Sequence, residues 1–269
     1  MKKLLIFISL LILTSAFLIW TMIIEPFSIE KTYLKIGLKN VSESAQKLKI
    51  VQISDIHFKK FNTMPRKIEE ELTRVKPDYL LITGDIVHWD IEKLDDLKEF
   101  LIKLSEIENV QMFGVFGNHE HLSKKFDTIK KILLDSKIKF LNNETIILPE
   151  GINLVGLDDP HLELNDLSVL GKIDATLPTI ILAHSPEVFR DIKIENTLVL
   201  SGHTHGGQIN VPILTNLLLP LKRDRQYKSG LFSENNKYLY VNRGLASTLL
   251  PMRLNCFPEI TIFNLTEKK

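Results

Sequence analysis

Three short apolar runs in the first half of the chain each end at a residue type that can bind a metal ion. Asp55, Asp85 and Asn118 follow these runs, and they stand 30 and 33 residues apart. Each interval has room for one helix, and alternating strands and helices predict parallel strands joined by crossover helices. In open sheets of this kind, ligand sites form beyond the carboxyl ends of the strands. The sequence therefore predicts that these three side chains converge.

The remaining elements follow from apolar periodicity and from turn residues. Strands are predicted at 31–38, 48–54, 79–83, 110–116, 152–155, 179–182, 197–200, 238–241 and 259–263. Helices are predicted at 65–75, 91–107 and 126–134, and a polar turn at 40–46. Because the second half is richer in strands, we predict an α/β fold: a four-layer α/β/β/α sandwich with helices on its outer faces. One domain should cover residues 28–266.

An apolar segment at the N-terminus predicts membrane attachment. Residues 4–24 carry no charge over 21 positions, which is long enough to span a bilayer as a helix. Lys2 and Lys3 precede this segment and favour a cytoplasmic N-terminus. We therefore expect residues 1–27 to be an uncleaved single-pass anchor in the cell membrane, with the domain outside the cytoplasm. The alternative is a signal peptide cleaved near Ala16, which would leave an apolar remnant.

Four of the eight histidines lie in four short polar motifs, at 55–57, 84–85, 117–120 and 202–205, and a fifth, His184, stands alone between the last two. These motifs and the isolated His184 supply seven candidate metal ligands. The candidates are Asp55, His57, Asp85, Asn118, His184, His203 and His205. Carboxylate, amide and imidazole groups together suit Mn, Fe or Zn better than Ca or Cu(I). Two such ions close together would clamp a phosphoryl group and activate a water molecule.

The local sequence around the motifs suits this interpretation. Gly84 lets the backbone bend tightly before Asp85. Asp55 and His57 stand two positions apart, which would place both on one side of an extended segment, where they could bind one ion together. The two histidines of 202–205 repeat this spacing.

The motifs differ in how specific they are. A lone histidine near a strand end, such as His184, is more often structural than a ligand. The Gly-Asn-His-Glu motif at 117–120 and the Gly-His-Thr-His motif at 202–205 are far more specific, and all the motifs occur in order after apolar runs. Three further histidines are expected at the surface or in support of the ligands: His88, His121 and His161. Residues 158–160 could form a simple turn or carry a carboxylate that supports a ligating histidine.

Composition excludes several other classes of protein. The net charge of +1 gives no reason to expect nucleic acid as a partner. A single cysteine, Cys256, allows neither an intramolecular disulfide nor a cysteine-based metal site, and we expect it to be a small buried hydrophobic residue. The basic residues within 222–225 could belong to a solvated loop or could attract phosphate.

Read together, the ordered motifs resemble the calcineurin-like metallophosphoesterases, over nearly all of residues 47–265. Downstream motifs resemble the membrane-associated bacterial branch of that superfamily. They are Gly206-Gly207-Gln208, Tyr227-x-Ser229-Gly230-Leu231, Asn242-Arg243-Gly244, Leu250-Pro251-x-Arg253 and Cys256-x-Pro258-Glu259-Ile260. The resemblance implies a metallophosphoesterase sandwich with two metal ions at the strand ends.

The resemblance also implies a role for each candidate residue. The first ion would be bound by Asp55, His57 and His205, and the second by Asn118, His184 and His203. Asp85 would bridge the two ions. His119 would be catalytic, donating to the phosphate or to the leaving group. His88 stands where this branch often has an acidic residue, so we expect it to affect substrate preference rather than the chemistry.

The activity that these roles imply is hydrolysis of a phosphomonoester, phosphodiester or pyrophosphate bond by a hydroxide that bridges two divalent metal ions. We expect a membrane-anchored monomer, and a lipid-linked substrate in the sharper form of the hypothesis. One alternative is similarity in function to the UDP-2,3-diacylglucosamine pyrophosphatases of lipid A synthesis. Another is a catalytically silent metal-binding scaffold. The apolar clusters 211–221 and 249–252 could touch the bilayer or an acyl chain, but we favour packing in the core.

Overall fold

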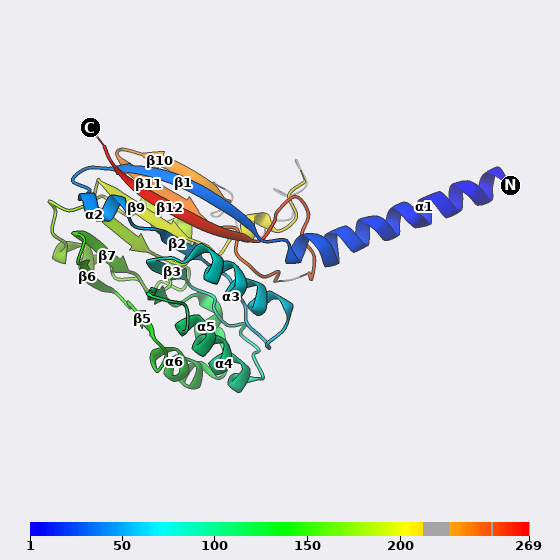
Figure 1. Cartoon of the computed structure of the whole chain (residues 1–269), viewed down its shortest axis with the longest axis horizontal. Helices are drawn as coiled ribbons and strands as arrows, with labels where there is room; N and C mark the ends of the chain where they lie inside the picture. Colours follow the sequence, from blue (N-terminus) through cyan, green and yellow to red (C-terminus); the bar gives the residue numbers. More distant parts are fainter. Residues whose placement is uncertain (212–225, 249, 269) are drawn as a thin grey trace.

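The computed structural model describes residues 1–211, 226–248 and 250–268. Within these residues, twelve strands form two six-stranded sheets that pack face to face, and a long helix extends away from them (Figure 1). The first sheet has the order β1 (Glu30–Leu38), β12 (Glu259–Glu267), β2 (Ile50–Ile53), β3 (Tyr79–Thr83), β4 (Gln111–Val115) and β5 (Ile138–Phe140). The second has the order β10 (Gly230–Glu234), β11 (Lys237–Val241), β9 (Thr197–Ser201), β8 (Thr179–Leu182), β7 (Ile152–Gly156) and β6 (Glu144–Leu148).

The central strands of both sheets are parallel, as the alternating pattern predicts. Strands β2 to β5 run parallel in the first sheet, and β7, β8, β9 and β11 run parallel in the second. The sequence does not predict the antiparallel neighbours of these strands. β12 is antiparallel to β2, while β6 and β10 are antiparallel edge strands. The parallel strands bring their carboxyl ends to one end of each sheet.

Three amphipathic helices cover the outer face of the first sheet: α3 (Thr63–Val75), α4 (Leu94–Ser105) and α6 (Phe126–Leu134). In α3 the apolar residues Ile68 and Leu72 are fully buried against this face. The Asn62 side chain accepts a hydrogen bond from the backbone N–H of Met64 and caps the helix. Lys76 ends it in the left-handed conformation, with φ of 50°.

The outer face of the second sheet carries the fourth layer. The 3-10 helices η3 (Leu167–Lys172) and η4 (Pro186–Arg190) pack their apolar side chains on it, including Val169, Val188 and Phe189. The four-layer prediction is therefore confirmed, but among the described residues this layer consists of short 3-10 turns rather than α-helices. Between β8 and β9, Pro186 starts the 3-10 helix η4, which ends at Arg190.

Several predicted boundaries need correction. The helix predicted at 91–107 covers Leu94–Ser105, and the turn predicted at 40–46 contains the short helix α2 (Glu43–Gln46). Ser42 caps α2, since its hydroxyl accepts a hydrogen bond from the Ala45 N–H. The strands β5, β6 and β10 and the single-turn helix α5 (Asn118–Leu122) were not predicted, because short segments carry little periodicity.

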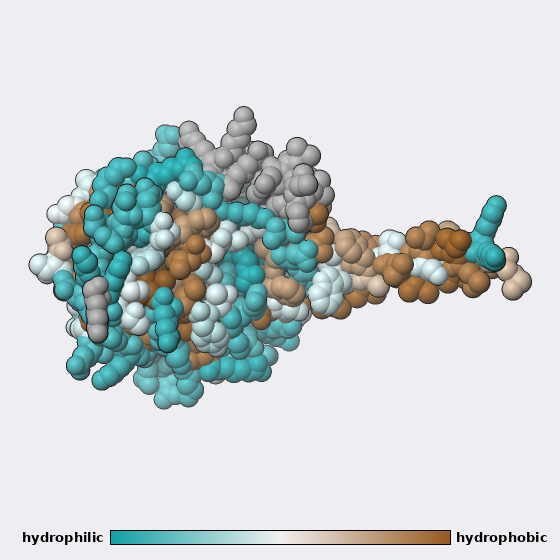
Figure 2. All heavy atoms as spheres, turned by 90° about the horizontal axis from the view of Figure 1, so that it is seen from above, coloured by the Kyte–Doolittle hydropathy of each residue, from teal (hydrophilic) through white to brown (hydrophobic). Residues whose placement is uncertain are grey.

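The N-terminal helix α1 (Lys2–Ile19) projects from one end of the sandwich and buries none of its residues. With the π-helical turn η1 (Trp20–Ile24) and the 3-10 turn η2 (Glu25–Phe27), it is long and apolar enough to cross a membrane. Figure 2 shows an almost continuous apolar surface along this helix, with hydrophilic atoms near its far tip. Its inner end is different, because Thr21, Glu25 and Pro26 are buried against the domain.

The two apolar clusters singled out in the sequence have different outcomes. In the cluster 211–221 all residues beyond 211 lie outside the described residues, as does the basic run at 222–225. In the cluster 249–252, Leu250 is 51% exposed and Pro251 is also exposed, so the expected core packing is wrong for these two residues.

Candidate metal centre

The polar motifs meet where the carboxyl ends of the parallel strands of both sheets lie side by side. In the first sheet, Asp55, Asp85 and Asn118 follow β2, β3 and β4. In the second, His184 follows β8 and His203 follows β9. A buried hydrogen bond of 2.9 Å from the side-chain amide of Gln52 in β2 to the Ser201 carbonyl in β9 joins the two sheets beside the centre. The structure thus brings all seven candidate ligands together; their binding of metal stays a prediction.

One half of the cluster contains Asp55, His57 and His205, which are all buried. The Nε2 atoms of His57 and His205 lie 3.0 Å apart. Asp55 Oδ1 lies 3.4 Å from His205 Nε2 and 3.9 Å from His57 Nε2. These three donor atoms lie at mutual distances that suit ligands around one cation.

The other half contains Asn118, His184 and His203. Asn118 Oδ1 lies 3.1 Å from His184 Nε2 and 3.1 Å from His203 Nδ1, and those two nitrogens are 3.2 Å apart. The donors of this half are an amide oxygen and two imidazole nitrogens. The grouping is the one that the resemblance assigns to the second ion.

Asp85 lies between the two halves. Its Oδ2 atom is 3.6 Å from His57 Nε2 and 3.3 Å from His184 Nε2, and its Oδ1 atom accepts a hydrogen bond of 2.8 Å from the His119 N–H. One carboxylate oxygen thus faces donors of both halves, which is the geometry of a bridging ligand. Asp85 also forms a close group with His57 and His119, although the resemblance gives His119 no ligand role.

The backbone around these residues is strained. Five candidate ligands have φ in the left-handed region, which is uncommon for residues other than glycine. They are Asp55 (51°), His57 (44°), Asp85 (51°), His203 (69°) and His205 (51°). The expectation that the pairs two positions apart lie on extended segments is therefore wrong. Such conformations persist only where the surroundings hold them, and they are common at functional sites.

Glycines allow the loops to approach one another. Gly84 has φ of 82°, and a Cβ atom there would lie 2.6 Å from His184 Nδ1. A Cβ atom on Gly202 would overlap the Ser54 hydroxyl and the Asp55 carboxylate. Any larger residue at Gly202 would displace a candidate ligand.

Glu120 is a structural residue of the centre that the sequence analysis missed. It is fully buried, and its Oε2 atom accepts hydrogen bonds from the backbone N–H groups of Gly117 (2.7 Å) and Asp85 (3.1 Å). Its Oε1 atom accepts from the Val87 N–H at 2.8 Å. Burial raises the pKa of Glu120 to about 8. Glu120 thus joins the loop after β4 to the loop after β3. Its place as the last residue of the Gly-Asn-His-Glu motif is the sequence feature that could have indicated this role.

Burial sets the charge of three of the four histidines among the candidate ligands. It lowers the pKa of His57 and of His203 well below the usual value and also lowers the pKa of His205. These imidazoles are therefore neutral and keep a lone pair for a cation. Burial would raise the pKa of Asp85, but attraction to His184 prevails and holds the pKa well below its usual range.

Two imidazoles are oriented by backbone carbonyls. His184 Nδ1 donates to the Thr83 carbonyl at 2.8 Å, and His205 Nδ1 donates to the Ala246 carbonyl at 3.1 Å. In both residues the Nε2 atom then faces the cluster, which is the arrangement found in metal-binding histidines. Burial would lower the pKa of His184, but attraction to Asp85 prevails and raises it well above its usual value, so this ring would give up a proton on binding an ion. The orientation of both rings and the donor chemistry of the cluster fit two divalent ions.

The remaining histidines fall into two sets. His119 is half-buried at the rim, with its Nε2 atom 3.9 Å from Asp85 Oδ2, and the ring of His88 lies 5.0 Å from its ring. The ring of His161 lies 4.8 Å from that of His203. His88 and His161 thus line the centre, whereas His121 pairs with Asp158, with 2.7 Å between its Nε2 atom and Oδ1.

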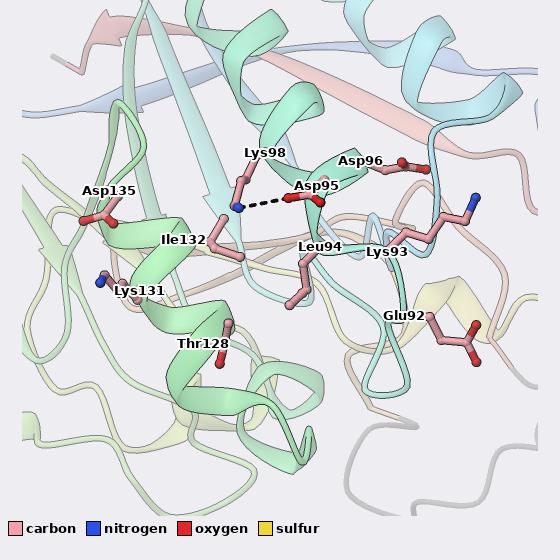
Figure 3. A pocket seen from close by; sticks show the side chains of 10 residues that line it. All are labelled: Glu92, Lys93, Leu94, Asp95, Asp96, Lys98, Thr128, Lys131, Ile132 and Asp135. Carbon is pink, nitrogen blue, oxygen red and sulfur yellow. Dashed lines mark hydrogen bonds and ion pairs between the residues drawn. The ribbon is translucent and has the colours of Figure 1, made fainter.

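A surface pocket elsewhere on the domain is separate from these histidines. It lies between α4 and α6, where Lys98 Nζ donates to Asp95 Oδ1 at 3.0 Å (Figure 3). Its lining is mostly charged, with residues of both signs, and contains none of the predicted site residues.

Two facing sheets with carboxylate, amide and imidazole groups gathered at their strand ends define a metallophosphoesterase. Residues 48–207 match the family described as calcineurin-like phosphoesterase. The chain is 31% identical over 253 residues to the metallophosphoesterase YkuE of Bacillus subtilis, with 90% of this chain and 87% of YkuE covered. It is 31% identical over 236 residues to the phosphodiesterase YaeI of Escherichia coli, with 83% and 84% covered.

A third relative is the UDP-2,3-diacylglucosamine pyrophosphatase LpxG of Chlamydia muridarum, 28% identical over 306 positions that cover 91% of each chain. These matches show that the chain belongs to the calcineurin-like phosphoesterase family. Members of this family use a dinuclear metal centre, and the protein is a hydrolase that acts on ester bonds.

Proposed function

We propose that the protein is a membrane-anchored, dinuclear metal-dependent phosphoesterase that acts on the phosphate or pyrophosphate group of a lipid-linked substrate. The observation that carries the two-ion centre is the position of Asp85 Oδ2, 3.6 Å from His57 Nε2 and 3.3 Å from His184 Nε2. In this proposal one ion is bound by Asp55, His57 and His205, the other by Asn118, His184 and His203, and Asp85 bridges them.

The roles of the residues follow from their positions. When bound, the two ions supply Lewis acidity and an activated water for attack on phosphorus. Asn118 contributes a neutral oxygen, so the centre carries little negative charge to repel an anionic phosphate. His119, half-buried beside Asp85, can donate a proton to the leaving oxygen when it is protonated; its burial lowers its pKa and so makes the protonated ring a stronger but less populated acid. His88 beside it would contact the leaving group and influence substrate preference.

The position of the apolar helix supports a substrate at the membrane surface. The Arg253 backbone N–H donates to the Thr21 carbonyl at 2.8 Å. The segment that contains exposed Leu250 therefore lies against the end of the helix next to the domain, residues 20–27, which we call the foot of the helix. Gln208, which follows the histidine motif, donates to the Leu250 carbonyl at 2.7 Å. A single loop therefore connects the foot of the helix to the metal centre, and its apolar tip is placed to touch lipid.

A second candidate is hydrolysis of UDP-2,3-diacylglucosamine, which the name of LpxG supports. The charge pattern opposes it, because Lys2 and Lys3 favour a domain outside the cytoplasm, where nucleotide-linked lipids are not made. A C-terminal alkaline phosphatase fusion distinguishes the two. An active fusion contradicts the cytosolic nucleotide-lipid role, and an inactive but stable fusion contradicts the extracytoplasmic location.

The proposed activity is tested with the full chain in lipid nanodiscs loaded with Mn. Hydrolysis of bis-p-nitrophenyl phosphate and p-nitrophenyl phosphate measures the activity on soluble esters. Hydrolysis of phospholipids or polyprenyl pyrophosphates in vesicles measures the preference for lipid substrates. We expect a higher kcat/KM for one lipid class than for the water-soluble ester of the same headgroup. Equal values for lipid and soluble esters would contradict the lipid-linked substrate, and no turnover with Mn, Fe or Zn would contradict the proposed activity.

A further inference from the structure

Two charged residues are buried away from the candidate ligands. Glu25 stands in η2 at the foot of the N-terminal helix, and Arg253 stands between β11 and β12; both have 0% exposure. A buried charge is costly unless hydrogen bonds compensate for it. Their hydrogen bonds reach Cys256 and Ala246, two residues that hydrogen-bond directly to His205.

Glu25 reaches this turn through one intermediate residue. Its Oε1 atom accepts a hydrogen bond of 2.6 Å from the Cys256 N–H, and its Oε2 atom accepts one of 2.9 Å from Trp20 Nε1. The Cys256 thiol donates to the His205 carbonyl at 3.2 Å. A Cβ atom on Gly206 would lie 2.8 Å from Cys256 Sγ, so the thiol packs closely against the turn.

Arg253 makes a second connection. Its backbone N–H donates to the Thr21 carbonyl, and its Nη2 atom donates to the Ala246 carbonyl at 2.5 Å. The same carbonyl oxygen accepts the Nδ1–H of His205 at 3.1 Å, which leaves Nε2 of that ring directed at His57. The foot of the helix therefore contacts Cys256, which bonds the His205 carbonyl, and Arg253, which bonds the same Ala246 carbonyl as the His205 ring.

We propose that Glu25 is a positioning residue for the metal centre: by holding Cys256, it fixes the turn that presents His205 to the ion shared with Asp55 and His57. This inference rests on the proposed metal centre. The inner end of the membrane helix is then a structural part of the site and more than a tether. A soluble form that begins at residue 28 would lack the contacts of both Glu25 and Thr21.

Substitutions in the full chain, purified in detergent, test this role. Glu25→Ala removes the oxygen that accepts the Cys256 N–H. Glu25→Gln keeps one carbonyl oxygen as an acceptor and should therefore keep most of the wild-type metal affinity. Met22→Ala is the matched control, because Met22 lies in the adjacent turn η1 and is exposed. The measurements are the Co(II) stoichiometry by elemental analysis, the Co(II) affinity by titration of the visible absorption, and Tm.

For Glu25→Ala we expect the affinity for one of two Co(II) ions to fall about tenfold or more, as for partners that support metal ligands. The visible spectrum of the bound ions should change, while Met22→Ala and Glu25→Gln should stay close to wild type. Unchanged affinities in folded Glu25→Ala would overturn the proposal, even with a lower Tm, because the role would then be structural only. An equal loss in Met22→Ala would overturn it too.

Cys256→Ala provides an independent variant if Glu25→Ala does not fold. It leaves the backbone hydrogen bond to Glu25 in place but removes the thiol that holds the His205 carbonyl. We expect the affinity for the same one of the two ions to fall. In Cys256→Ser the hydroxyl can still donate to the His205 carbonyl, so part of the affinity should remain. Wild-type affinities in Cys256→Ala would overturn the proposal. A wild-type chain that binds fewer than two ions would contradict the proposed metal centre itself, which separates the two failures.

Discussion

The Nε2 atoms of His57 and His205 lie 3.0 Å apart, although 148 positions separate the two residues in the sequence. Both rings are buried, and burial lowers the pKa of each, so they face one another as neutral groups. Because Nδ1 of His205 donates to the Ala246 carbonyl, its Nε2 atom carries a lone pair, which either an Nε2–H of His57 or a cation between the two rings can meet. The chain therefore folds into an arrangement that a bound ion would stabilise.

Removal of metal should lower stability. Dialysis against a chelator should reduce Tm, because the carboxylates and imidazoles of the centre lose the cation that balances them. Ligand at a hundredfold excess over Kd contributes about 2.7 kcal/mol to the free energy of unfolding. Calorimetry with Mn, Fe or Zn added back should restore Tm, and Ca should not. A Tm that is unaffected by chelation would contradict the assignment of these residues as metal ligands.

Asp85→Asn should abolish most activity by weakening both ions. The substitution keeps the size of the side chain but removes the charge on the oxygen that lies between His57 and His184. We expect metal affinity and kcat/KM to fall by at least about 100-fold. Elemental analysis and p-nitrophenyl phosphate turnover measure the two effects. Full metal content with normal turnover would exclude the bridging role.

His119→Ala should reduce turnover but leave both ions bound. A general acid typically contributes about 100- to 10,000-fold to the rate, and the loss should appear in kcat. His121→Ala is the matched control two positions away, since its ring pairs with Asp158. Metal content and kcat are measured for both variants. Loss of an ion in His119→Ala would instead identify His119 as a ligand.

Gly202→Ala should destabilise the fold and the centre together. The added methyl group would overlap the Ser54 hydroxyl and the Asp55 carboxylate. Overpacking of this kind costs about 1–3 kcal/mol, which chemical denaturation measures. Gly171→Ala is the control, because a Cβ atom there meets nothing within 4 Å. Equal stability of the two variants would show that the loop relaxes freely.

Leu250→Glu should impair hydrolysis of a membrane-bound substrate selectively. Leu250 is exposed beside the foot of the helix, so a charge there opposes contact with lipid. We expect a higher KM for vesicle substrate and an unchanged rate with p-nitrophenyl phosphate. Leu231→Glu changes a similarly exposed leucine on β10 and should affect neither. A matching increase of KM in both variants would contradict membrane contact at Leu250.

The sequence predicted the positions of the parallel strands because their apolar runs are sharply bounded. The predicted strands at 79–83 and 179–182 match β3 and β8 in both bounds. The polar residues that follow the strands could be placed at one end of the sheets from topology alone. Strands such as β5, with three residues, carry too little periodicity to be recognised.

The geometry within the centre was less accessible from the sequence. The left-handed conformations of Asp55 and His57 depend on backbone hydrogen bonds to the next loop, from the Asp55 N–H to the Gly84 carbonyl and from the His57 N–H to the Asp85 carbonyl. Such contacts form only in the folded chain. The contacts of Glu25 with Cys256 and of Arg253 with Thr21 are equally invisible to local patterns, because each joins the beginning of the chain to its end.

Only two residues separate the N-terminal helical segment from the sandwich. The turn η2 ends at Phe27, β1 begins at Glu30, and β1 then pairs with β12 over nine residues. With the helix in a bilayer, the short connection would keep the catalytic centre at a nearly constant distance from the membrane surface. For the proposed lipid-linked substrate, encounters would then depend on lateral diffusion in two dimensions. Turnover should follow the mole fraction of substrate in the membrane, whatever the volume of the suspension.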